Sequence, residues 1–302
     1  MISPRHIYIA KQAIKLRLPF ANTLRRMKRS TSGYRPNAGN IALTFADLIR
    51  LNKLMRVNGE RLHGTVLEIG TGWFPINGIL AHLAGAERVI LTDITPHMDQ
   101  DTFMTARQIV IEQLDEHAEA FGIDPASARS RLLPAKVPRD LGLVYQAPFD
   151  ITKLEAGSLD VVMSRACLEH IPVPDLRSLC VALRPCLRPD GFMAHAIDNT
   201  DHLSHFDPSI TRMNFLTWTE ARHRTLWRVI GGGENRLRHH EYASLFEQAG
   251  YTVVAEDALL LDKDLNGLKG LRLMPPYDVM TAEQLAASTS WFFLRPSDAS
   301  VS

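Results

Sequence analysis

Residues 66–75 read Val-Leu-Glu-Ile-Gly-Thr-Gly-Trp-Phe-Pro. An apolar run that ends in an acidic residue and passes into a Gly-x-Gly turn is typical of a buried strand followed by a helix. Glycine is favoured in such a turn because the backbone bends sharply and lets a ligand approach closely. We therefore expect a strand at 65–69, a ligand-binding turn at 70–72 and a helix from residue 76.

Further apolar strands alternate with helical patterns along the chain. The expected strands lie at 88–93, 131–134, 159–164, 192–197, 251–256 and 291–294. The expected helices lie at 41–58, 76–83, 99–121, 174–187 and 240–249. Such alternation produces right-handed crossovers, and therefore a parallel sheet that is covered on both faces. We predict a doubly wound α/β fold with a mostly parallel, seven-stranded, Rossmann-like sheet.

Asp93 stands at the end of the second expected strand, about twenty residues after the turn. A carboxylate in this position can accept hydrogen bonds from both ribose hydroxyls of a nucleoside. A dinucleotide site would require a further glycine shortly after Gly72, where this chain has Pro75. A helix N-terminus without that glycine is less suited to a pyrophosphate, so the pattern favours a nucleoside ligand that carries no phosphate.

The order of the motifs resembles that of class I S-adenosylmethionine-dependent methyltransferases. The segments that carry the resemblance are LEIGTGWFP at 67–75, LTDI at 91–94, FDITKLEAGSLDVVMSRACLEHI at 149–171 and LRPDGFM at 187–193. The similarity covers about residues 60–197 in order and resumes at 240–256. It departs at 73–75, where Trp-Phe-Pro replaces the family's usual small residue. This departure implies that the methionine end of the cofactor is enclosed differently.

The resemblance implies methyltransferase activity with S-adenosyl-L-methionine as the cofactor. Carried over position by position, the motifs imply that the cofactor contacts Glu68, Gly70, Thr71, Gly72, Asp93, Ile94, Asp150, Ile151 and Ser164. Asp150 would face the adenine. The sulfonium already carries a reactive methyl group, so such a protein mainly aligns the acceptor with it and excludes water. In the alternative interpretation, Glu68 and Asp93 only cap a turn and a helix.

Titratable side chains gather directly after the expected strand at 192–197. They are Asp198, Asp201, His202, His205 and Asp207. The carboxyl ends of parallel strands are where open α/β sheets bind ligands. We predict general-base catalysis by His202 or His205, with Asp201 or Asp207 orienting the imidazole. Two alternatives remain open, namely a divalent metal held by Asp198, Asp201 and a histidine, and a purely structural set of helix caps and packing histidines.

Three segments resemble a subset of bacterial methyltransferases that is associated with glycan and secondary-metabolite pathways. They are DHLSHFDPSI at 201–210, NFLTW at 214–218 and ENRLR at 234–238. This resemblance implies that the methyl acceptor is a hydroxyl of a small polar molecule or a glycan. Asn235, Arg236 and Trp218 would then bind the acceptor, or they would instead cap a helix, carry surface charge and fill the core.

Two other functions stay open at this point. One is methyl transfer to a nitrogen of a secondary metabolite. The other is a non-catalytic, nucleoside-binding partner domain with a degenerate first motif. Cofactor binding and turnover distinguish the non-catalytic function from the two enzymatic ones.

Charge is unevenly distributed, although 34 Lys and Arg residues nearly balance 33 Asp and Glu residues. Residues 1–46 contain nine basic residues and no acidic one, which leaves 25 basic against 33 acidic residues at 47–302. We expect a basic helical arm with a linker at 1–46. The methyltransferase domain would occupy 47–302, with insertions near 198–238 and 257–288 and a cap over the acceptor site. The acidic domain argues against nucleic acid as a substrate.

The basic arm has several interpretations. It would contact an anionic membrane surface or an acidic carrier protein, join a partner in a homodimer, cover the acceptor site, or simply pack on the domain. The three cysteines, Cys167, Cys180 and Cys186, form no Cys-x-x-Cys pair, so we expect reduced thiols and no structural zinc site. No apolar run is long enough to span a bilayer and no uninterrupted secretory segment is present. We therefore expect a cytoplasmic protein.

Overall fold

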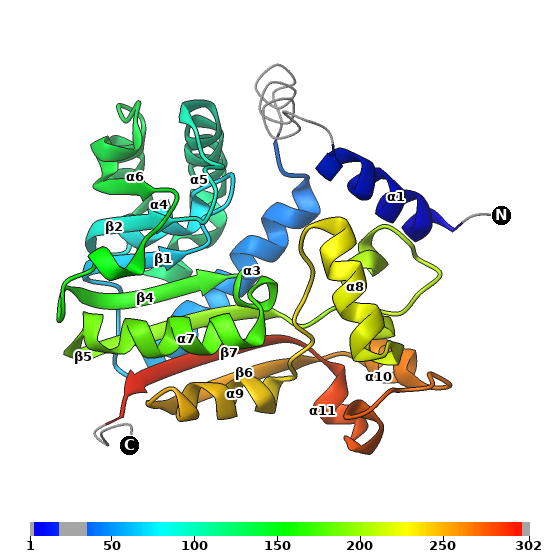
Figure 1. Ribbon diagram of the computed structural model, residues 1–302. Helices are drawn as coiled ribbons and strands as arrows, with labels where there is room; N and C mark the ends of the chain where they lie inside the picture. Colours follow the sequence, from blue (N-terminus) through cyan, green and yellow to red (C-terminus); the bar gives the residue numbers. More distant parts are fainter. Residues whose placement is uncertain (1–2, 18–34, 298–302) are drawn as a thin grey trace.

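The computed structural model describes residues 3–17 and 35–297. Its centre is a seven-stranded sheet with the order β3-β2-β1-β4-β5-β7-β6 (Figure 1). The strands are β1 (Gly64–Ile69), β2 (Ala86–Thr92), β3 (Leu143–Gln146), β4 (Leu159–Arg165), β5 (Leu187–Asp198), β6 (Tyr251–Leu260) and β7 (Ala287–Pro296). β1 to β5 pair in parallel, and β7 lies antiparallel between β5 and β6. The prediction of a mostly parallel, doubly wound α/β sheet is confirmed.

Helices cover both faces of this sheet (Figure 1). The described helices are α1 (Pro4–Arg17), α3 (Ala38–Val57), α4 (Ile76–Leu83), α5 (Gln100–Phe121), α6 (Pro125–Leu132), α7 (Val173–Leu183), α8 (Glu220–Ile230), α9 (His239–Gln248), α10 (Asp262–Leu268) and α11 (Ala282–Ala286). One apolar core joins α3, α4, α5 and α6 to the sheet, and a second joins α7 and α9 to the opposite face. The sheet is therefore the middle of three layers.

Neighbouring residues of the central strands enter opposite cores. Val66 belongs to the α3–α6 side and Leu67 to the α7–α9 side, and Val161 and Val162 alternate in the same way. All four are fully buried. A strand that is covered on both faces has no polar side to present, which is why these segments read as continuous apolar runs rather than as alternating ones.

The region between α5 and β4 differs from the expectation. The short strand predicted at 131–134 is instead the end of α6, and the corresponding strand, β3, lies at Leu143–Gln146. Asp124 accepts a hydrogen bond from the Ser127 N–H and Pro125 occupies the first helical position. Both features start a helix there, and they outweigh the weak β signal of the residues that follow.

The two insertions pack against each other through a third apolar core. Its buried members are Leu203, Met213, Phe215, Leu216, Trp218, Tyr277 and Leu285. The second insertion is shorter than predicted, because β6 continues to Leu260 and β7 begins at Ala287. The Met274 N–H donates to the Leu216 carbonyl at 3.0 Å. The insertions thus form one small lobe beyond the carboxyl end of β5.

The described part of the basic arm packs on this lobe. α1 lies beside α8 (Figure 1). The Tyr8 ring stacks on Phe206 with centroids 4.0 Å apart, and the Arg5 guanidinium lies 3.8 Å from the Asp207 carboxylate. Residues 1–2 and 18–34 of the predicted arm and linker lie outside the described residues. α3 begins at Ala38 because the Asn37 side chain accepts from the Asn40 N–H.

A membrane-spanning helix is not found in the parts of the chain at 3–17 and 35–297, where each helix is too short or too polar to cross a bilayer.

Arg238 joins the insertions to the sheet although it is fully buried. Its guanidinium donates to the carbonyls of Asn199 at 2.8 Å and Leu285 at 3.2 Å, and it lies 5.3 Å from the centre of the Phe215 ring. Burial lowers the pKa of Arg238. The cost of burying this charge is offset by hydrogen bonds to carbonyls that would otherwise be unpaired.

We predict that Arg238→Met lowers the free energy of unfolding by about 3 kcal/mol, because it leaves buried carbonyls without donors. Urea unfolding measures this loss. The matched control is Arg224→Met, which removes an exposed ion pair with Glu220 and should change stability by about 0.5 kcal/mol or less. Equal and small effects of both substitutions would contradict the structural role of Arg238.

Candidate active site

The turn after β1 packs against the loop after β4 on one side and is open on the other. Gly70 and Gly72 have φ angles of 72° and 69°, which favour glycine. A Cβ atom on Gly70 would overlap the Sγ atom of Cys167, whereas one on Gly72 would meet nothing within 4 Å. The turn therefore rests on the loop after β4 and leaves its outer side free for a ligand.

Glu68 holds the turn from the inside. Its carboxylate accepts hydrogen bonds from Asn77 Nδ2 at 2.9 Å and from Thr71 Oγ1 at 3.3 Å. The side chain is only 1% exposed, and burial raises the pKa of Glu68 to about 7. Glu68 thereby connects β1, the glycine turn and α4, so it shapes the site rather than lining its open side.

Asp93 lies across the turn at the end of β2. Both carboxylate oxygens lie 3.1 Å from the Gly72 nitrogen, and Oδ2 also accepts from the Tyr145 hydroxyl at 2.8 Å. Burial raises the pKa of Asp93 to about 6, so the carboxylate is mostly ionised at neutral pH. The next side chain, Ile94, is 86% exposed. An anionic acceptor beside an exposed apolar side chain suits the ribose and the base of a nucleoside.

The remaining predicted cofactor residues differ in their surroundings. Asp150 is partly exposed, and its Oδ1 accepts from the Thr152 N–H at 3.1 Å. Ile151 is half-buried beside it. Ser164, by contrast, is fully buried, and its hydroxyl lies 2.8 Å from His195 Nδ1. The Ser164 side chain therefore links β4 to β5.

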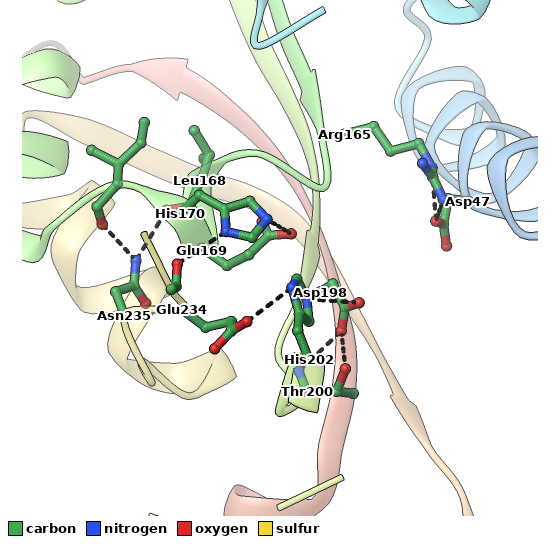
Figure 2. Close-up of polar contacts among 12 residues, drawn as sticks. Asp47, Arg165, Leu168, Glu169, His170, Asp198, Thr200, His202, Glu234 and Asn235 are labelled. Carbon is green, nitrogen blue, oxygen red and sulfur yellow. Dashed lines mark hydrogen bonds and ion pairs between the residues drawn. The ribbon is translucent and has the colours of Figure 1, made fainter. Parts of the chain in front are cut away.

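A second group of side chains, the acid–histidine cluster, lies where β4 and β5 end (Figure 2). Its members are Glu169, His170, Asp198, His202, His205 and Glu234. Glu169 and His170 belong to a short helix, η3 (Leu168–His170), that follows β4. His202 and His205 belong to a second short helix, η5 (His202–His205), that follows β5. Glu234 comes from the segment after α8.

His202 lies between two carboxylates at the centre of the cluster (Figure 2). Its Nδ1 is 2.9 Å from Glu234 Oε1, and its Nε2 is 3.3 Å from Asp198 Oδ2. Burial lowers the pKa of His202, but the two carboxylates outweigh this effect and raise it to about 11. In this arrangement His202 is a cation at neutral pH.

Two further imidazoles flank this cation. The ring of His170 is 5.0 Å from that of His202, and the ring of His205 is 5.1 Å from it on stacked planes. Burial and the positive charge of His202 lower the pKa of both His170 and His205. The cluster thus contains a row of three imidazoles in which the outer two are neutral and able to accept a proton.

Glu169 is the most unusual member of the cluster. Its side chain is 1% exposed, and neither carboxylate oxygen has a hydrogen-bond partner among the described residues. Oε1 lies 4.0 Å from His170 Nε2. Burial, followed by the nearby charge of Asp198, raises the pKa of Glu169 to about 8.

Asp201 has a different role from the one that the sequence predicted for it. Its buried carboxylate accepts from the Leu203 N–H at 2.9 Å and from Asn214 Nδ2 at 3.2 Å, so it caps η5. The carboxylates that contact His202 are those of Asp198 and Glu234 instead. Asp207 likewise accepts hydrogen bonds from the Ser209 N–H and hydroxyl.

The three predicted acceptor residues are held in the framework of the lobe. Asn235 Nδ2 donates to the Leu168 and Ile171 carbonyls at 3.0 Å each, which fastens the segment that carries Glu234 to η3. Arg236 is buried and donates to the carbonyl of Trp218 at 2.8 Å. Trp218 itself is buried in the third core.

Sequence reasoning did not select Glu169 and Glu234. The rule that located Asp198, a polar residue just beyond a parallel strand, also applies to Glu169 after β4. Glu234 has no comparable signal, since it lies 32 positions after His202 and only the path of the chain around α8 brings the two together.

The sheet order, the glycine turn and the carboxylate at the end of β2 define a class I methyltransferase fold with a nucleoside site. Residues 43–256 match the family model described as a methyltransferase domain, and the chain belongs to this family. The protein is an S-adenosylmethionine-dependent methyltransferase, and S-adenosyl-L-methionine is its cofactor. The open side of Gly72 together with Asp93 and Ile94 fits the adenosine part of that cofactor.

Solved structures with a similar fold are distant in sequence. An S-adenosylmethionine-dependent methyltransferase from Mesorhizobium loti is 14% identical, with 80% of this chain and 95% of that chain covered and a TM-score of 0.45. Phosphoethanolamine N-methyltransferase 2 from Haemonchus contortus is also 14% identical, with 82% of this chain and 53% of that chain covered and a TM-score of 0.45. No curated protein matches the sequence.

We predict that Asp93→Asn weakens S-adenosylmethionine binding about 10- to 100-fold, since charge-assisted hydrogen bonds to the ribose are lost. Glu87→Gln, an exposed site at the other end of β2, is the isosteric control and should bind normally. In the unaltered protein the affinity should also fall as the pH drops below about 6, because the protonated Asp93 is a poorer acceptor. Calorimetry across this pH range measures both effects, and a pH-independent affinity would contradict them.

We also predict that the two glycines of the turn respond differently to alanine. Gly70→Ala adds both backbone strain and an overlap with Cys167, and should cost about 2–5 kcal/mol of stability. Gly72→Ala adds the strain alone, about 1–2 kcal/mol, but places a methyl group where the cofactor approaches. Urea unfolding and cofactor titration separate the two effects. Equal stability losses would mean that Gly70 does not rest on the β4 loop.

Proposed function

We propose that this methyltransferase transfers the methyl group to a hydroxyl of a small polar molecule or a glycan, with His205 as the general base. The observation that carries the proposal is the row of three imidazoles, in which a central cation keeps its neighbours neutral. A hydroxyl loses its proton as its oxygen bonds to the methyl group, so a neutral imidazole nearby assists the transfer.

The position of the row beside the cofactor turn supports this proposal. Cys167, which lies beneath Gly70, is followed directly by η3. Burial raises the pKa of the Cys167 thiol, and the charges of Glu169, Asp93 and Glu68 add to this effect. Carboxylates of the cofactor turn and of the acid–histidine cluster therefore surround the same thiol, which indicates that the two groups of residues are close neighbours.

The protein's own residues have separate tasks in this mechanism. The bound cofactor supplies the methyl group as part of a sulfonium. Gly72 and Asp93 hold its nucleoside part, while Asp198 and Glu234 keep His202 in place as a cation. His205 then accepts the proton of the acceptor hydroxyl on a ring nitrogen. Alignment and exclusion of water account for most of the rate enhancement in such a reaction.

The basic arm is part of the same proposal. Tyr8 of α1 stacks on Phe206, the residue that follows His205, so the arm approaches the proposed base from outside. We propose that α1 covers the acceptor side of the domain, held there by the Tyr8–Phe206 stack and by Arg5 beside Asp207.

We predict that His205→Gln lowers kcat about 10²- to 10⁴-fold, because the proton acceptor is lost, while the affinity for S-adenosylmethionine is unchanged. His240→Gln, an exposed histidine on α9, is the control and should retain full activity. The acceptor is first identified by incubating cell extract with ¹³C-methyl-labelled cofactor and isolating the labelled product.

The chemical shift of the transferred ¹³C-methyl group identifies the atom that receives it. A methyl ether supports the proposal. A methyl group on nitrogen would instead support the alternative acceptor class, and cofactor binding without any labelled product would support a non-catalytic role. An unchanged kcat in His205→Gln would remove His205 from the mechanism.

A further inference from the structure

We propose that Glu169, His170 and His202 form a binding site for a divalent transition-metal ion, with Zn²⁺ as the best-matched ion. One ligand atom from each residue lies within 4.8 Å of the others, and Figure 2 shows the three side chains directed toward one another. Two imidazoles and one carboxylate are a common ligand set for first-row transition metals. Metal–ligand bonds of about 2.0–2.2 Å require only a small inward movement of these side chains.

The hydrogen bonding of His170 leaves one nitrogen free for a metal. Its Nδ1 lies 3.0 Å from the Gly233 carbonyl oxygen, so Nδ1 carries the proton and donates it. Nε2 then has a free lone pair, and it is the atom that lies 4.0 Å from Glu169 Oε1. A backbone carbonyl that fixes the tautomer and the ring orientation is the usual outer partner of a metal-binding histidine.

His202 has the same arrangement, with a carboxylate as its outer partner. Nδ1 lies 2.9 Å from Glu234 Oε1. Nε2 is buried and has no well-aligned hydrogen bond to any described residue, although Asp198 Oδ2 lies 3.3 Å away and attracts it electrostatically. A metal ion on His202 Nε2 would take the place of the proton that faces Asp198, while Glu234 continues to hold Nδ1.

Glu169 supplies an independent observation in favour of a cation. A buried carboxylate normally has hydrogen-bond partners, yet both oxygens of Glu169 lack one among the described residues. The carboxylates of Asp198 and Glu234 lie 3.3 and 2.9 Å from the two ring nitrogens of His202 instead. A divalent ion would bind the free oxygens of Glu169 and stabilise the ionised form of this buried carboxylate.

The proposed ligand set differs from the metal alternative that the sequence suggested. Asp201 is used in capping η5, and Asp198 is oriented by Thr200, whose N–H and hydroxyl both donate to Oδ1. The site also does not depend on the identity of the methyl acceptor. A metal ion in this place would replace the His202 proton as the positive charge beside His205, so both proposals are compatible.

The test is titration of the untagged, full-length protein, treated first with a chelator, with Zn²⁺ in calorimetry and with Co²⁺ in visible spectroscopy. We expect one ion per chain and a Co²⁺ spectrum without a thiolate charge-transfer band, which excludes binding by the cysteines. Glu169→Gln, His170→Ala and His202→Ala should each weaken binding at least 100-fold. Glu234→Gln should weaken it about 10- to 100-fold, because it removes only the outer partner of His202.

His205→Ala is the matched control, since its ring stacks on His202 but it is not one of the three ligands. Its Zn²⁺ affinity should stay within about 3-fold of the unaltered protein, and urea unfolding should show that each variant is folded. The proposal would be overturned if the unaltered protein did not bind Zn²⁺. It would also be overturned if Glu169→Gln and His202→Ala bound Zn²⁺ as tightly as the unaltered protein does. These measurements use neither cofactor nor acceptor, so their outcome is separate from that of the methylation experiments.

Discussion

The parallel pairing of β1 with β4 is the constraint on which both parts of the site depend. These strands are in register from Val66 with Val161 to Ile69 with Ser164, so the segments that follow them leave the sheet at the same level. The glycine turn after β1 therefore rests on Cys167 after β4, and η3 starts one residue later. On one side of this pair the sheet continues from β1 to β2 and β3, and on the other side it continues from β4 to β5. Open α/β sheets bind ligands where the order of the strands diverges in this way.

Compensation of buried charge dominates the second half of the site. Glu169 is almost fully buried, and Asp198, His202 and Glu234 are partly buried, while the rings of His170 and His205 remain exposed. Buried charges are tolerated only when they are paired. His202 meets this requirement for Asp198 and Glu234, whereas Glu169 remains without a partner in the described part of the chain. The same burial that makes this arrangement costly also shifts the pKa values of the histidines. The lobe thus contributes Glu234 to the site and helps to keep His202 in its charged form.

Most of the fold could be predicted from local patterns. The glycine turn, the apolar strands and Asp93 each have a signal within a few neighbouring residues, and their order in the chain is enough to indicate a class I methyltransferase. The error at 131–134 arose because a helix cap at Asp124 and Pro125 outweighed a weak strand signal. His202 and His205 lie together near the end of β5, as the sequence predicted, but the carboxylates that contact His202 are Asp198 and Glu234 rather than Asp201 or Asp207. Asp201 is close to His202 in sequence and was therefore predicted to orient it.

The amino-acid sequence alone was sufficient for the class of fold, the glycine turn and the cofactor, because these depend on residues that follow one another along β1 and β2. The partners of His202 could be recognised only in three dimensions. Glu234 follows α8 in the chain, and Glu169 follows β4, a different strand from the one that precedes His202. Contacts between distant segments depend on how the insertions fold back over the sheet, and no local pattern of polar and apolar residues records that path. The chemistry of the acceptor side is consequently a property of the tertiary structure.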